Sequence, residues 1–188
     1  MARSLSAALA TAGYPPQDVL RLGQAFATAM APRIERLEDD HHPAYLHPGR
    51  SVLVLIHDVG AVPCTTLVTA ALLESEDHQL RVPPGEVTRF GARIVADLAA
   101  LPLPGDERLV ERLVGLSREG ALAALAERLD HLRHLHLRDD LRPRWAERHR
   151  EVVGAWLPFA ERTEPRLATR FAHWERTFRR RVAQLPRV

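Results

Sequence analysis

The sequence predicts an all-α protein that forms a single helical bundle. Apolar residues recur at helical spacing along most of the chain, and strong helix formers such as Ala, Leu and Arg dominate the composition. No long linker, repeat or low-complexity segment divides the 188 residues. Because this length can bury one sizeable core, we expect residues 1–188 to be one domain.

The first long helix is predicted over 19–37, where apolar residues follow a 3.6-residue period. Asp18 is placed to cap its start, and Pro32 is expected to kink or end it. The next eight residues, 38–45, are polar and contain a proline, so they predict a loop.

Two apolar runs follow this loop. Residues 47–60 begin as a helix, although their β-branched residues leave a strand over 51–56 as an alternative. Gly60 and Pro63 break this run. Residues 64–75 are apolar on all sides, which predicts a buried helix.

The second half of the chain continues the helical pattern. Leucine at helical spacing predicts two helices within 107–141, separated around 117–120. Further helices are predicted over 84–101, 144–163 and 164–185. The whole chain is therefore expected to contain six to eight helices and no sheet.

Composition limits the classes of function. All 26 basic residues are arginine and 24 residues are acidic, so the net charge is only +2 and gives no strong nucleic-acid signal. Cys64 is the only cysteine, which excludes an internal disulfide and predicts a reducing cytoplasm. No apolar window of about 20 residues predicts a membrane span, and the start of the chain resembles a signal peptide only faintly.

Four stretches occur in an order and at spacings that are typical of one enzyme family. They are "PAYLHPGRSVLVL" (43–55), the segment 67–101 that contains "ALLESEDH", "ALAERLDHLRHL" (124–135), and "REVVGAWLPFAERTEPRLATRFAHWERTF" (150–178). Together they resemble the hydrolase domain of the RelA/SpoT family, a branch of the HD-domain phosphohydrolases. The resemblance covers roughly 19–180, and it implies a stand-alone, all-α HD-type domain.

The resemblance also implies a metal site. Enzymes of this family bind a divalent metal, typically Mn²⁺, with two His and two Asp, and they remove the 3′-pyrophosphate of guanosine tetra- or pentaphosphate. The first metal ligand corresponds to His47. The central His-Asp pair corresponds to Glu74 and Ser75, and the last Asp corresponds to Glu127, which is one methylene longer. One ligand is therefore intact, two are replaced by carboxylates, and one is lost.

Other positions of the family pattern are changed as well. An Asn that follows the last ligand corresponds to His131, a candidate substrate-binding residue. The acidic pair that orients the attacking water corresponds to Glu76 and Asp77, with His78 next in line. A basic pair on the substrate side corresponds to Glu38-Asp39, where acidic side chains would repel a polyphosphate.

These changes predict a degenerate site. The first hypothesis is a non-catalytic or weakly catalytic domain that binds a guanine nucleotide or an unnamed protein partner. The alternative is an active Mn²⁺-dependent guanosine tetraphosphate hydrolase, or a related nucleotide phosphohydrolase, with a carboxylate-rich variant site. That rearranged site would use His47, Glu74, Asp77 and Glu127, with His131 or His78 nearby.

Three further motifs have simpler interpretations. His57-Asp58 is a His-Asp pair, but its position favours a helix C-terminus rather than the metal motif. His131 and His134 are one helical turn apart and could share a metal, although a solvated helix face explains them equally well. The basic run 176–182 could contact phosphate or RNA, yet it is also typical of a solvated face.

Overall fold

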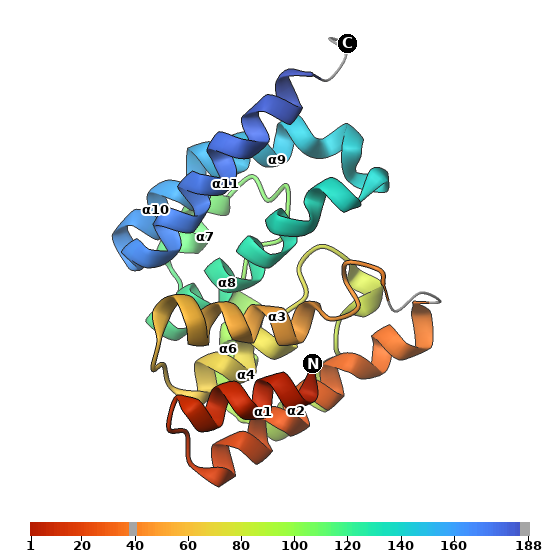
Figure 1. Cartoon of the computed structure of the whole chain (residues 1–188), viewed down its shortest axis with the longest axis vertical. Coiled ribbons are helices and arrows are strands. Elements are labelled where there is room, and N and C mark those ends of the chain that lie inside the picture. Colours follow the sequence, from red (N-terminus) through yellow and green to blue (C-terminus); the bar gives the residue numbers. More distant parts are fainter. Residues whose placement is uncertain (38–40, 185–188) are drawn as a thin grey trace.

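A computed structural model describes residues 1–37 and 41–184, and these residues contain helices but no strand (Figure 1). The all-α prediction is confirmed. The described residues form the α-helices α1 to α11, which are more than the six to eight helices that the sequence predicts. The strand alternative over 51–56 is wrong, because α3 (His47–Val54) continues directly into a π-helical turn at Leu55–Val59.

The helices form two groups joined by α8 (Arg118–His134), which crosses the middle of the molecule (Figure 1). On one side of α8 lie α1 (Ala2–Thr11), α2 (Pro16–Arg36), α3, α4 (Cys64–Leu72), α5 (Pro84–Val87) and α6 (Ala92–Ala100). On the other side lie α9 (Trp145–Glu151), α10 (Leu157–Thr163) and α11 (Pro165–Ala183), with α7 (Leu109–Val114) behind them.

The first long helix differs from its prediction at both marked positions. It begins at Pro16, so Asp18 lies in its first turn and Pro15 occupies the cap position. Proline is tolerated there because the first amides of a helix have no partner within it. Pro32 lies inside α2 and does not end it, since the helix continues to Arg36.

Helix α8 forms the centre of the core. Ser117 caps it, accepting a hydrogen bond at its Oγ from the Gly120 amide at 3.0 Å. All residues from 120 to 130 are buried, because α3, α4, α6, α10 and α11 pack around the helix. Three of these buried residues, Glu127, Arg128 and Asp130, are charged and therefore require partners on the neighbouring helices.

The His57-Asp58 pair lies at a helix end, as its position in the sequence indicates. Gly60 ends the π-helical turn with φ of 95°, a conformation that favours glycine, and its amide donates to the Leu55 carbonyl at 3.0 Å. His57 is exposed. Asp58 forms ion pairs with Arg133 on α8 and with Arg170 on α11.

Among the described residues, every helix is too short or too polar to cross a bilayer.

We expect Leu125→Ala to lower the free energy of unfolding by about 2–5 kcal/mol, because the Leu125 side chain is fully buried in α8 and its loss leaves a cavity. Urea unfolding measures this change. Leu20→Ala is the matched control, since Leu20 is 65% exposed and its truncation should change stability by less than about 0.5 kcal/mol. Equal losses in the two variants would contradict the central position of α8.

Candidate functional site

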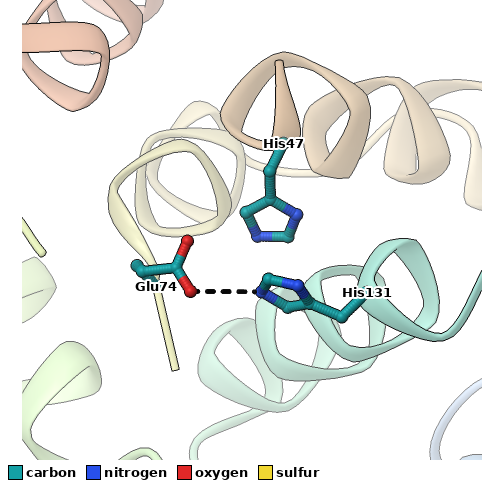
Figure 2. A group of neighbouring side chains, drawn as sticks. All are labelled: His47, Glu74 and His131. Carbon is teal, nitrogen blue, oxygen red and sulfur yellow. Dashed lines mark ion pairs between the residues drawn. The ribbon is translucent and has the colours of Figure 1, made fainter. Parts of the chain in front are cut away.

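Three candidate residues from distant parts of the chain meet in the core (Figure 2). His47 is the first residue of α3, Glu74 follows the end of α4, and His131 lies near the end of α8. Their ligand atoms all lie within 4.8 Å of one another, so they could hold a metal ion. His47 and Glu74 are buried, and the His131 side chain keeps 11% of its surface exposed.

Asp130 fixes the orientation of His47. Its Oδ2 lies 2.7 Å from His47 Nδ1, and Arg50 Nε donates to its Oδ1 at 2.9 Å. Burial favours the neutral acid, but the hydrogen bond and charge of His47, together with Arg50, outweigh it and hold the Asp130 pKa well below its usual range. An ionised carboxylate only accepts hydrogen bonds, so His47 Nδ1 carries the proton.

The other ring nitrogen of His47 therefore bears a lone pair. Burial and the neighbouring His131 lower the pKa of His47, which keeps its ring neutral. His47 Nε2 lies 3.9 Å from Glu127 Oε1, and the His47 ring stacks on that of His131 with centroids 3.9 Å apart. A neutral imidazole supported by a carboxylate in this way is typical of metal-binding histidines.

His131 lies between two carboxylates. Its Nε2 is 3.1 Å from Glu127 Oε1 and 3.3 Å from Glu74 Oε1. Burial opposes protonation of the ring, but the charges of Glu74 and Glu127 outweigh it and raise the pKa of His131 to about 10. Both carboxylate oxygens are close to Nε2, but the geometry does not allow a hydrogen bond with either of them. His131 Nε2 is therefore a buried polar atom without a hydrogen-bond partner.

Glu74 has a cationic partner from α2. Arg33, which is 1% exposed, donates from one terminal nitrogen to Glu74 Oε2 at 2.5 Å. The other carboxylate oxygen of Glu74 accepts from the amides of Glu76 and Asp77 at 3.0 and 3.1 Å. Burial would raise the Glu74 pKa, but nearby cationic and imidazole groups, His131 foremost, hold it well below its usual range.

Glu127 is held by Ser75. Both the amide and the hydroxyl of Ser75 donate to Glu127 Oε1, at 3.0 and 2.7 Å. Burial opposes ionisation of Glu127, but His131 and Arg128 outweigh it and lower the Glu127 pKa to about 2. Arg128 also donates to the Ser75 hydroxyl at 2.8 Å. Ser75 thus links a carboxylate to a guanidinium group.

The two candidate catalytic residues are used in other interactions. Glu76 pairs with Arg128, and with Arg148 at 3.1 Å; both arginines have only 2% of their side-chain surface exposed. Burial would raise the pKa of Glu76, but these guanidinium groups lower it, which makes the carboxylate a weaker base. Asp77 caps the short 3₁₀ helix at His78–Leu80, accepting at Oδ1 from the Gln79 amide at 2.9 Å.

The space beside His131 is small. A cavity of about 10 Å³ lies between the segment that precedes α3 and the C-terminal half of α8, and Arg50, Arg138 and Arg148 contribute to its lining. This volume accommodates about one water molecule.

The imidazole and carboxylate side chains of this site are better suited to holding a divalent ion than to catalysing hydrolysis. Imidazole and carboxylate ligands suit Mn²⁺ or Zn²⁺, and the unpartnered Nε2 of His131 is the atom that such an ion would satisfy. However, Arg33 already neutralises Glu74, and the cavity of about 10 Å³ is much smaller than a phosphate ester. An ion would also have to displace the His131 proton.

The structure brings together two candidate metal ligands, His47 and Glu74, and the candidate substrate-binding residue His131. Glu127, the remaining candidate metal ligand, lies next to His131. The structure also adds Asp130 and Arg33, which the sequence analysis missed. Asp130 could have been found, because it lies three residues after Glu127 and so faces a similar direction on one helix. Arg33 has no such local signal. The acidic pair Glu38-Asp39 lies outside the described residues.

No protein-family model, curated protein or solved structure matches this chain.

The raised pKa of His131 predicts a stability that falls with alkaline pH in metal-free protein. The unfolded histidine loses its proton near its ordinary pKa of 6.5, whereas the folded one keeps it to about pH 10. Its stabilising contribution is therefore complete below pH 6.5 and is lost towards pH 10, by up to about 1.4 kcal/mol per pH unit. Urea unfolding between these limits measures it. The same slope in His131→Gln would contradict this origin.

The buried pair between Arg33 and Glu74 predicts a strong coupling. Arg33→Met should lower the free energy of unfolding by about 3–5 kcal/mol, because it leaves the buried Glu74 carboxylate uncompensated. Combining it with Glu74→Gln should recover part of this loss in a double-mutant cycle. Arg108→Gln is the control, since its exposed pair with Glu111 contributes less than about 1 kcal/mol. Simple additivity of the two core variants would refute the coupling.

Proposed function

We propose that this chain is a helical domain related to the HD phosphohydrolases that acts as a non-catalytic binding domain for a nucleotide or a protein partner. One observation carries the proposal: every carboxylate at the centre is already matched by a cation of the protein. Glu74 has Arg33, Glu76 has Arg128 and Arg148, Asp130 has Arg50, and Glu127 has the protonated His131.

This charge balance leaves little driving force for metal-dependent hydrolysis. A hydrolytic metal centre needs an open position for water and a general base of suitable pKa. The lowered pKa of Glu76 works against the second requirement, and the cavity of about 10 Å³, although it accommodates about one water molecule, leaves little space for a substrate beside it. The buried network is better suited to holding α2, α3 and α8 in one arrangement, so that recognition falls to the surface.

The second candidate function is that of a Mn²⁺-dependent phosphohydrolase acting on guanosine tetraphosphate or a related nucleotide. Two observations favour it. His47 presents a lone pair supported by Asp130, and His131 Nε2 has no hydrogen-bond partner. Both are features of residues that bind a metal. This function would require the His131 proton to leave and the arginine side chains around the cavity to move.

Metal content and turnover, measured on one sample, distinguish the two functions. The protein is loaded with Mn²⁺, unbound ion is removed, the retained metal is quantified, and pyrophosphate release from guanosine tetraphosphate is followed. We expect no turnover above the protein-free rate. The triple variant Glu74→His, Ser75→Asp and Glu127→Asp restores the ligand types of the family, and it should retain more Mn²⁺ than the natural chain.

Stoichiometric metal with turnover that disappears in Glu127→Ala would overturn the proposal and establish the hydrolase. Leu20→Ala, an exposed site far from these ligands in sequence, serves as the matched control for nonspecific loss of activity. Circular dichroism of each variant shows whether a loss of metal reflects the site or the fold.

A further inference from the structure

A second feature of the molecule lies away from the buried centre. A groove of about 350 Å³ runs between α11 and the C-terminal part of α8 with the turn that follows it. Its lining contains three arginines and two histidines but no carboxylate. These residues are Arg133, His136, Arg170, His173 and Arg181. A concave surface lined by cations of one sign concentrates anions.

Tertiary packing brings two separate basic motifs together at this groove. The histidine- and arginine-rich end of α8 forms one wall, and α11 forms the other with Arg170, His173 and, from its terminal basic run, Arg181. Trp174 Nε1 donates to the Leu132 carbonyl at 2.7 Å, which holds the two helices in register. Trp174 and Phe178 are buried at the base of the groove, so the apolar face of α11 is used in packing.

The charge of α11 is largely uncompensated. Glu175 is the only acidic residue between 165 and 184, and it pairs with His149 and Arg179. Within residues 1–37 and 41–184, Arg181 has no ion-pair partner. By contrast, Arg93 and Arg108 on other surfaces each pair with a carboxylate.

Asp58 supplies the nearest compensating charge. Its carboxylate lies 3.2 Å from Arg133 and 2.6 Å from Arg170, and it is only 8% exposed. One carboxylate thus orders two guanidinium groups, one on each side of the groove, and balances only one of them. The groove keeps an excess of positive charge and a defined geometry.

We propose that this groove binds the sugar-phosphate backbone of a nucleic acid. Guanidinium groups match phosphate oxygens in charge and in planar geometry. Arg170 and Arg181 lie about 16 Å apart along α11, so a single phosphate could contact only one of them. A nucleic-acid strand carries a phosphate at every nucleotide and could contact both. The proposal goes beyond the function proposed above and does not depend on whether the buried centre is catalytic.

Fluorescence anisotropy tests the proposal on the full chain. The probes are a labelled oligouridine RNA of about 12 nucleotides and a DNA duplex of similar length. For the single strand, three groove arginines predict a slope of about −2 in a plot of log affinity against log salt concentration between about 50 and 200 mM. Tighter binding of the strand or of the duplex supports the proposal and identifies the form that is recognised.

The groove variant combines Arg170→Gln with Arg181→Gln and leaves Arg133 in place, so that the buried Asp58 keeps a partner. It should bind the oligouridine at least about tenfold more weakly and reduce the salt slope by about 1.4. The matched control combines Arg93→Gln with Arg108→Gln, which removes the same charge from other surfaces. It should bind like the natural chain. Thermal unfolding confirms that both variants fold.

A gain-of-affinity variant protects the test against loss of fold. Thr177 is exposed and lines the groove, so Thr177→Arg adds a cation there and should steepen the salt slope by about 0.7. Equal weakening by the groove and control variants would overturn the proposal, because it would reflect net charge alone. Binding to vesicles that contain phosphatidylserine, without binding to either oligonucleotide, would also overturn it.

Discussion

The structure depends on the burial of carboxylates where α2, α3 and α8 meet. An ionised group in a protein interior is tolerated only if a partner compensates it. Here the compensating groups come from different helices: Arg33 from α2 binds Glu74 after α4, and Arg50 from α3 binds Asp130 of α8. Each pair therefore joins two helices, and the correct packing of these helices is the condition under which the charges can be buried.

This constraint also governs the chemistry of the centre. His131 can carry either a proton or a metal ion at Nε2, and the nearby carboxylates favour both. The guanidinium groups decide the balance, because Arg33 and Arg128 neutralise charge that a bound cation would otherwise neutralise. A site with the geometry of a metal centre can thus serve as a structural network when the protein supplies its own cations.

On the surface of the molecule, charged side chains do not need partners from the protein. On α11 the apolar side packs against α8, while the arginines of its outer side are left mostly without carboxylates. Exposed cations remain solvated, so they require no internal partner. The buried centre therefore contributes order to the fold, and the uncompensated groove offers charge to a ligand. Asp58 links these regions in the chain, since it lies in the π-helical turn that continues α3 and it orders Arg170 in the groove.

The sequence by itself determined the helical class and most of the helices, because these depend on local periodicity, whereas the candidate residues His47, Glu74, Glu127 and His131 came from a resemblance to a known family. The sequence misplaced the start of α2, and α2 does not end at Pro32, since packing stabilises a helix beyond its local signals. Only the tertiary structure supplied the partners Arg33 and Asp130, which lie 41 and 83 residues from the groups that they bind. Protonation depends on such long-range neighbours, and so the state of the centre was decided by the fold.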